Sequence, residues 1–297
     1  MGTWVTIEIP SSDDRPDDRD RDAAVDRAFG WFRDVEQACS RFDASSELSR
    51  LTRAVGVDTP VSALLFRAVE FACAVAAESD GAFDPTVGRQ MVALGFNRHY
   101  VTGERVDAPP GSSDATWRDL HLDRERSTIR LARPLQLDLG AVAKGLAVDL
   151  AARELAPLAN YAIDAGGDLF LAGTNGDGQP WAVGVRHPRE ADALLGTIRV
   201  SDLAVCTSGD YERRGAAEHH HHLVDPRTGQ PTRTAASVTV VAPTAMVADA
   251  IGTAAFVLGT AGGLDLCARS GVEGLMVATD LAVTMTAGMR DAFHPHA

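Results

Sequence analysis

The sequence predicts an α+β fold, in which helices pack against mixed or antiparallel sheets. Three observations favour this class. Stretches with helical spacing and stretches with strand alternation occur in the same chain, they do not alternate in a regular βαβ order, and the sequence contains no internal repeat. Of the 297 residues, 45% are hydrophobic and 23% are charged, which suits a globular chain with a sizeable core. Because there is no clear linker, we predict a single domain over residues 1–297.

The first part of the chain predicts a strand, a loop and two helices. Residues 1–9 alternate like a strand. Residues 11–22 contain six Asp and three Arg, and we expect them to form an exposed charged loop. Apolar side chains recur near helical spacing in residues 22–39 and again in residues 61–78, so both segments are predicted to be amphipathic helices.

The later elements mix strands with helices. Alternation and turn residues predict strands within 128–139, 161–171, 181–185 and 238–241, with Pro134 interrupting the first and Gly166-Gly167 dividing the second into two. Apolar spacing predicts helices over 142–155 and 244–258, and the tail 275–286 is expected to form a hairpin that turns at residues 279–280.

Charge and composition limit the partners. The 28 Lys and Arg against 41 Asp and Glu give a net charge of −13, and no basic stripe is present, so binding to nucleic acid is not expected. An anionic ligand would need local neutralisation by a metal ion, a lysine or a helix N-terminus. No run approaches the length of a membrane span and residues 1–9 do not resemble a signal peptide, so we expect a cytoplasmic protein, or a trimmed form of an exported one.

The strand–helix junction at residues 137–145 is the first candidate site. Small residues at a helix N-terminus expose backbone N–H groups, and the helix dipole favours an anion there. Lys144 adds a full positive charge, although the spacing of a Walker A loop is absent. The junction is therefore either a phosphate-binding loop or a tight turn with a solvated lysine.

A second candidate lies on the predicted helix 244–258. Asp249 and Thr253 are four residues apart, which places their side-chain oxygens on one helix face. Such hard oxygen ligands suit Mg²⁺, which often shares its coordination shell with phosphates. The alternative is a polar stripe on an otherwise apolar helix.

Three further segments combine turn residues with polar groups. Residues 206–211 contain Thr207, Ser208 and Gly209, which would either approach a ligand closely or form an ordinary turn. Residues 81–88 form a rigid turn that holds one apolar ring, Phe83, and one carboxylate, Asp84. We expect most of the four histidines at 219–222 to be solvated, and expect Asp164 and Asp168 to stabilise the turn at Gly166-Gly167.

The order of these segments along one chain resembles the FAD:protein FMN transferases, the ApbE family. Eight blocks carry the resemblance: Met1-Gly2-Thr3, residues 45–51, residues 81–87, residues 138–145 with Ala-Lys-Gly, Gly166-Gly167-Asp168, residues 207–211, residues 222–226, and Ala248-Asp249-Ala250. The resemblance runs from residue 1 to about residue 293. It implies a T-fold-like α+β architecture that binds FAD in a cleft and uses Mg²⁺.

The resemblance also implies roles for particular residues. Contacts to FAD would come from Met1, Phe42, Ala82, Phe83, Asp84 and Lys144, from Thr207, Ser208 and Gly209 near the pyrophosphate, and from His222 beside the ligand. The metal contacts would be the backbone oxygen of Ala141 and the side chains of Asp249 and Thr253. Lys144, His222 and Asp249 would take part in catalysis. Phe42 stands where many members have Tyr, and the contact of Met1 depends on whether the initiator methionine is retained.

The reaction implied by the resemblance is transfer of FMN from FAD to a Thr or Ser hydroxyl of a partner protein, with release of AMP. Some members instead hydrolyse FAD to FMN and AMP, and a non-catalytic protein that binds or stores FAD is a further alternative. Both reactions require the same pyrophosphate and metal site, so the sequence does not separate them. It also does not identify the acceptor protein, the general base or the oligomeric state.

Overall fold

The computed structural model describes residues 2–10, 18–100, 102–107, 114–212 and 221–296, and its centre is a seven-stranded sheet. The strands lie in the order β1-β5-β6-β9-β12-β13-β14, and every neighbouring pair is antiparallel. Their bounds are Val5–Glu8 (β1), Tyr161–Ala165 (β5), Asp168–Ala172 (β6), Leu203–Gly209 (β9), Ser237–Ala242 (β12), Glu273–Val277 (β13) and Val283–Met285 (β14). Antiparallel strands in one sheet, together with helices in the same chain, confirm the α+β class.

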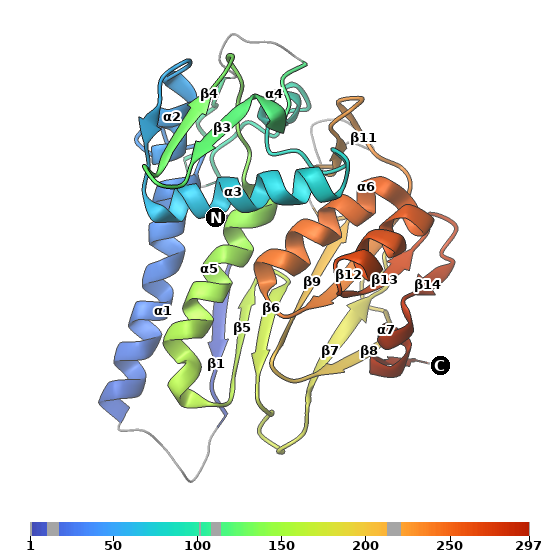
Figure 1. Ribbon diagram of the computed structural model, residues 1–297. Coiled ribbons are helices and arrows are strands. Elements are labelled where there is room, and N and C mark those ends of the chain that lie inside the picture. Colours follow the sequence, from blue (N-terminus) through green and yellow to red (C-terminus); the bar gives the residue numbers. More distant parts are fainter. Residues whose placement is uncertain (1, 11–17, 101, 108–113, 213–220, 297) are drawn as a thin grey trace.

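The long helices cover one face of this sheet (Figure 1), whereas the short helix α7 (Ala287–Ala292) packs on the other face. The long ones are α1 (Asp18–Cys39), α3 (Ala63–Glu78), α5 (Gly140–Leu155) and α6 (Ala245–Arg269). The other short ones are α2 (Glu47–Arg53), α4 (Gly88–Ala93) and the 3₁₀ turns Trp117–Asp119 and Ala156–Leu158. The main hydrophobic core lies between the helices and the sheet, and its largest fully buried side chain is Phe256 of α6.

A three-stranded sheet, in the order β15-β8-β7, packs on the other face. It consists of β7 (Trp181–Arg186), β8 (Leu194–Val200) and β15 (Phe293–Pro295). The core between the two sheets buries residues of β6, β9, β12 and β13 but, among the described residues, none of β1 or β5. The corresponding face of those two strands is therefore only partly covered.

The remaining strands form two small sheets at the end of the molecule that lies above α3 in Figure 1. One contains β2 (Thr59–Pro60), β4 (Thr128–Leu131) and β3 (Leu120–Asp123), in that order. The other pairs β10 (Val224–Asp225) with β11 (Gln230–Pro231). Buried Ile129 and Leu131 join the first of these sheets to the main core.

Helix α6 is apolar on nearly all sides, as is typical of a buried helix. The sheet covers one side of it, and α5 and α3 cover the other. Its length and composition would allow it to cross a membrane, but 61% of its most apolar window is buried inside the structure. The helix is broken at Gly259, whose φ of +74° favours glycine. The predicted end at residue 258 coincides with this break, yet the helix resumes and ends at Arg269.

Three sequence predictions need correction. Helix α1 begins at Asp18, so the predicted charged loop is wrong for residues 18–22, and residues 11–17 lie outside the described part of the chain. The predicted strand within 128–139 is regular only over β4, because Pro134 interrupts it. Residues 206–209, expected to form a loop after a strand, are the last four residues of β9. The hairpins β5–β6 and β13–β14 are confirmed.

Candidate active site

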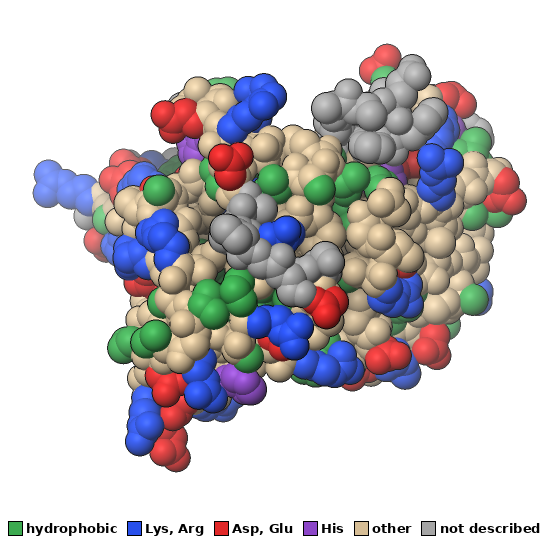
Figure 2. All heavy atoms as spheres, turned by 90° about the horizontal axis from the view of Figure 1, so that it is seen from above, with side chains coloured by type: hydrophobic (Ala, Val, Ile, Leu, Met, Phe, Trp, Pro, Cys, Tyr) green, Lys and Arg blue, Asp and Glu red, His purple; other side chains and the backbone are tan. Residues whose placement is uncertain are grey.

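A cleft of about 1000 Å³ lies where the ends of α5 and α6 meet strands β6 and β9. All the site residues predicted from the sequence line it except Met1, which lies outside the described residues: Phe42, Ala82, Phe83, Asp84, Ala141, Lys144, Thr207, Ser208, Gly209, His222, Asp249 and Thr253. They come from segments up to 211 positions apart in the sequence, from 42 to 253, so the fold brings them together. On the face seen from above in Figure 2, basic and acidic side chains are interspersed.

The polar centre of the cleft is a cluster of three charged side chains. Lys144 lies in the second turn of α5, Asp168 is the first residue of β6, and Asp249 lies in the second turn of α6. Lys144 Nζ forms an ion pair with Asp168 Oδ2 and lies 3.8 Å from Asp249 Oδ2. The three side chains are only 14%, 3% and 11% exposed, so solvent screens their charges weakly. Lys144 is also the only lysine in the chain.

The close approach of α5 and α6 positions this cluster. A Cβ atom on Gly145 would lie 2.5 Å from the backbone N and Cα of Met246, so only glycine allows the two helices to touch there. One turn later, the carboxylate of Asp149 accepts hydrogen bonds from the backbone N–H groups of Ala245 and Met246, at 2.7 and 3.1 Å. The residue before Gly145 is therefore held against α6.

Burial and the close approach of the three groups shift the pKa values of Asp168 and Lys144. Burial raises the pKa of Asp168 well above its usual range, and the neighbouring charge of Asp249 raises it further. Burial alone would lower the pKa of Lys144, but the charges of Asp249 and Asp168 outweigh it and raise that pKa, so the ammonium stays protonated. Two buried carboxyl groups thus share one ammonium, and the raised pKa of Asp168 favours a proton on its carboxyl.

The chemistry of these donors fits a magnesium ion. Asp249 Oδ2 is buried and has no hydrogen-bond partner among the described residues. Thr253 lies one helical turn beyond Asp249, and Ala141 lies in the first turn of α5, on the wall of the same cleft. No group of three or more His, Cys, Asp or Glu side chains capable of holding a metal occurs among the described residues, so a metal here would rely on hydroxyl, carbonyl and substrate oxygens. Mg²⁺ is commonly held in that way.

Aromatic and cationic groups form the wall of the cleft near Phe42. The guanidinium of Arg41 lies over the Phe42 ring, 4.1 Å from its centroid, and its Nε donates to Asp138 Oδ2 at 2.6 Å. Arg41 Nη1 is buried without a hydrogen-bond partner in the described part of the chain. The rings of Phe96 and His222 meet edge to face, with centroids 6.5 Å apart. Flat rings beside a buried cation are suited to a planar, electron-rich ligand.

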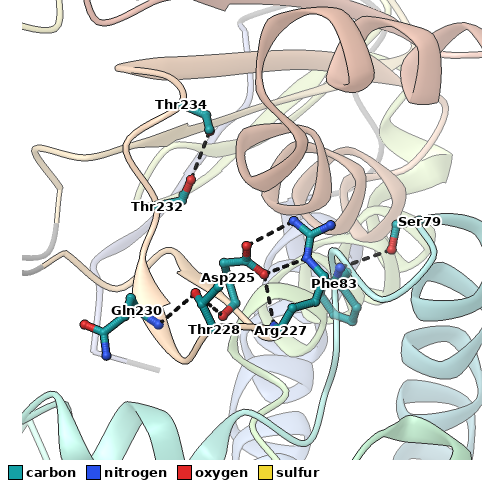
Figure 3. A network of polar contacts seen from close by, with 8 residues as sticks. All are labelled: Ser79, Phe83, Asp225, Arg227, Thr228, Gln230, Thr232 and Thr234. Carbon is teal, nitrogen blue, oxygen red and sulfur yellow. Dashed lines mark hydrogen bonds and ion pairs between the residues drawn. The ribbon is translucent and has the colours of Figure 1, made fainter.

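The turn at residues 82–84 is rigid because its polar groups are satisfied within the protein. The backbone N–H of Phe83 donates to Ser79 Oγ at 3.1 Å (Figure 3). Asp84 accepts hydrogen bonds from Thr86 and from the backbone of Trp117. Burial raises the pKa of Asp84, and these hydrogen bonds partly oppose the rise. Since the Phe83 side chain is buried in the core, its ring is not an exposed platform.

The loop after His222 is held by a bidentate ion pair. Arg227 donates to both carboxylate oxygens of Asp225, at 2.8 and 3.0 Å (Figure 3). In the histidine run, His221 is buried and bonded to the carbonyl of Thr232, whereas His222 lines the cleft. The expectation that most of these histidines are solvated is therefore wrong for His221, and His219 and His220 lie outside the described residues.

The structure adds Asp168, Arg41 and Asp138 to the residues predicted for the site. We expect Asp168 to stabilise the Gly166-Gly167 turn, but among the described residues only Asp164 does so, accepting from the backbone of Gly167 at 2.9 Å. Asp168 instead starts β6 and points at Lys144. Its position could be found only from the pairing of β6 with β9, which places Asp168 opposite Cys206. A sequence pattern carries no signal for that contact.

Residues 1–276 match the model of the ApbE family. The chain belongs to the ApbE family.

Named members of the ApbE family cover most of this chain. A FAD:protein FMN transferase of Haemophilus influenzae is 31% identical over 270 residues, which are 84% of this chain and 77% of the relative. One from Treponema pallidum is 34% identical over 303 residues, covering 91% of this chain and 81% of the relative. The crystal structure of the ApbE protein of Thermotoga maritima superposes with a TM-score of 0.84 at 27% identity, covering 98% of this chain and 99% of the other. The α+β class is thus that of the ApbE fold.

Proposed function

We propose that this protein transfers FMN from FAD to a Thr or Ser hydroxyl of a partner protein and releases AMP. The proposal rests on one observation above all: the buried Lys144–Asp168–Asp249 cluster at the centre of a cleft in an ApbE-family chain. The FAD:protein FMN transferases of the family cover most of the chain and support this reaction. The cleft, with aromatic walls and a buried ammonium, can accommodate a flavin nucleotide and its pyrophosphate.

In the proposed reaction, the acceptor oxygen forms a bond to the phosphorus of the FMN half. The bond from that phosphorus to the oxygen bridging the two phosphates breaks, AMP leaves with the bridging oxygen, and the proton of the acceptor hydroxyl is released to solvent. Such a displacement depends mainly on positioning and on stabilising negative charge. Lys144 would supply a fixed positive charge, since its neighbours keep the ammonium protonated.

We further propose that Asp249, Thr253 and the carbonyl of Ala141 hold Mg²⁺. A bound magnesium ion would neutralise charge on the pyrophosphate oxygens. Arg41 and Asp138 would orient the ring system beside Phe42, and His222 would border the ligand from the opposite loop. Thr207 and Ser208, at the end of β9, would border the pyrophosphate. Ser208 would do so on the side of α6, where it faces Gly252, whereas the Thr207 side chain lies on the other face of the sheet and is hydrogen-bonded to Thr239.

The test is AMP release from FAD with and without Mg²⁺, together with mass spectrometry of a Thr-containing acceptor. We expect AMP and a gain of FMN mass on the acceptor only when Mg²⁺ is present. AMP without a labelled acceptor would identify a hydrolase, and bound FAD without either product would identify a storage protein.

Substitution of the proposed metal ligand gives a second test. We expect Asp249→Ala to lower Mg²⁺-dependent turnover by at least about a hundredfold. Removing only a hydrogen-bond partner of a metal ligand already lowers metal affinity or activity about 10–100-fold, and Asp249 would be a ligand itself. Asp265→Ala, on the exposed part of the same helix, is the matched control and should keep full activity. Retained turnover in Asp249→Ala would refute the assigned metal site.

A further inference from the structure

Besides the residues around the charged cluster, the cleft is lined by a second group of residues, which we call the arm. Two sets of residues line this arm, one from the outer face of the seven-stranded sheet and one from β7. The sheet contributes Glu8, Ala162, Asp164, Leu169 and Leu171, and β7 contributes residues 181–184 and 186. None of these residues belongs to the set assigned above to the flavin nucleotide, the pyrophosphate or the metal.

Strand register shows why this sheet face is open. In β1, Val5 and Ile7 pack into the helix-side core, so Thr6 and Glu8 face the other side. Thr6 is opposite Asp164, and Glu8 is opposite Ala162, so these side chains lie next to one another on that face. Thr6, Glu8 and Asp164 are exposed, whereas Ala162 is half-buried at the margin of the core under the small sheet.

Trp4 extends the same face towards the Gly166-Gly167 turn. It precedes Val5, which pairs with Ala165, and its side chain is 92% exposed. An indole exposed to this extent beside a reactive cleft has the character of an anchor for a protein partner.

Strand β7 offers an unpaired main-chain edge to the arm. Its only ladder among the described residues is with β8, so the N–H and C=O groups of its other edge are available for pairing. Its exposed side chains at Ala182 and Gly184 are small, which leaves the backbone accessible. The strand is six residues long, enough to pair with an extended segment of roughly 20 Å.

We propose that an extended segment of the acceptor protein binds in this arm by pairing with β7, and so presents its hydroxyl to the charged cluster. This inference rests on the proposed function, because only transfer to a protein requires a second polymer in the cleft. Continuity of the arm with the cluster in a single cavity supports it. Main-chain pairing would give affinity, and side-chain contacts would give selectivity.

Charge indicates which acceptor residues fit. Glu8 and Asp164 are exposed on the floor of the arm, whereas Arg186 is already paired with Glu212 at 3.3 Å. With Arg186 neutralised by Glu212, the arm keeps the negative charges of Glu8 and Asp164. A basic residue in the acceptor segment, a few positions from the reactive hydroxyl, therefore fits the arm best.

The experiment adds bulk beside the open edge of β7 without touching the cluster. Ala182→Trp adds a large side chain on an exposed position of β7, and Ala282→Trp, at an exposed position beside the opposite edge strand β14, is the matched control. Rates of FMN transfer are measured against the concentration of a peptide that carries one Thr flanked by Lys, and FAD binding is measured by fluorescence titration. We expect Ala182→Trp to raise the acceptor KM at least tenfold while FAD affinity changes less than twofold, and Ala282→Trp to match the wild type.

A charge exchange provides a test that does not depend on packing. Glu8→Lys should raise KM for the Lys-flanked peptide and lower it for a Glu-flanked peptide of the same length. An unchanged acceptor KM in both Ala182→Trp and Glu8→Lys would overturn the docking site while leaving the transferase intact. Loss of FAD affinity in Ala182→Trp would assign the arm to the nucleotide instead. A wild-type enzyme that releases AMP but labels neither peptide nor acceptor protein would overturn the proposed function itself.

Discussion

Lys144 shows how one side chain can depend on the whole site. It is the only lysine of the chain, while the other 27 of the 28 basic residues are arginine. A compact ammonium on a flexible stem fits between two carboxylates where a planar guanidinium would need a wider, fork-shaped pocket. The position therefore requires lysine rather than any cation.

We expect Lys144→Met to lower the free energy of unfolding at pH 7 by roughly 3–5 kcal/mol, because it leaves the Asp168 and Asp249 carboxylates buried without their partner. Urea unfolding followed by circular dichroism measures this loss. Lys144→Arg, which keeps the charge, should recover part of the stability but not the turnover. A Lys144→Met variant as stable as the wild type would show that solvent or ions already compensate the carboxylates.

For single residues, the sequence predicts which side chains line the site better than it predicts which of them contact one another. The spacing of Asp249 and Thr253 predicts a shared helix face, and the structure brings both to the cleft. Asp168 could not be assigned, because its partner Lys144 is on another element and the β6–β9 register decides which way the carboxylate points. The roles of these residues in metal and FAD binding stay predictions.

Helices α5 and α6 meet at a glycine, and this contact sets the position of Lys144. We expect Gly145→Ala to lower stability by roughly 3 kcal/mol or more, since its Cβ would lie 2.5 Å from the backbone of Met246 and must push the helices apart. Gly176→Ala, in a surface turn with no atom within 4 Å of the added carbon, is the control and should change stability little. Thermal unfolding of the two variants decides the point, and equal midpoints would contradict the close packing.

The contact between α5 and α6 also includes an ionisable group, the carboxyl of Asp149. Burial raises the pKa of Asp149 to about 6 in the folded protein, although its hydrogen bonds to the start of α6 oppose the rise. The folded pKa is above the unfolded value, so this group's stabilising contribution is present below about pH 4 and is lost as the pH rises through about 6. We expect the stability of Asp149→Asn relative to wild type to increase between pH 4 and pH 7, by up to about 3 kcal/mol.

Urea unfolding of both proteins across that range measures the difference. Loss of one hydrogen bond in Asp149→Asn lowers stability equally at every pH, so only the slope carries the test. A difference that is constant with pH would show that Asp149 titrates alike in the folded and unfolded chains.

Elements with a strong local period were predictable, and irregular ones were not. Helices α3 and α5 and the β5–β6 hairpin follow from spacing and turn glycines. Helix α1 extends into residues 18–22, where charged side chains form a solvated helix rather than a loop. The sequence does not predict that Thr207 and Ser208 belong to strand β9, because their small hydroxyl side chains suggest a turn. Pairing of β9 with both β6 and β12 keeps this segment extended.

For the whole molecule, ligand binding and folding should be coupled. We expect saturating FAD with Mg²⁺, at about 100 times the dissociation constant, to raise the free energy of unfolding by about 2.7 kcal/mol. Addition of EDTA should remove the metal-dependent part, and Asp249→Ala should lack that part from the start. Thermal unfolding with FAD alone is the control, and a midpoint unaffected by Mg²⁺ in the presence of FAD would argue against the proposed metal site.

The general class of the molecule was readable from its mixture of periods, but its strand order was not. Pairings such as β1 with β5 and β6 with β9 join distant segments, and hydrophobic alternation does not identify which strands become neighbours. The separate outer sheet of β7, β8 and β15 was likewise not predictable, since its strand β15 comes from the very end of the chain.

The position of β1 has a consequence for synthesis. Val5 pairs with Ala165, so β1 waits for a partner that leaves the ribosome 160 residues later. At a translation rate of roughly 5–20 residues per second, this interval is about 8–32 seconds. Throughout that time β1 has no strand partner, so it is exposed to chaperones and proteases. Ribosome-bound chains halted before residue 165 should remain sensitive to proteolysis at β1, whereas chains halted well beyond it should gain protection there.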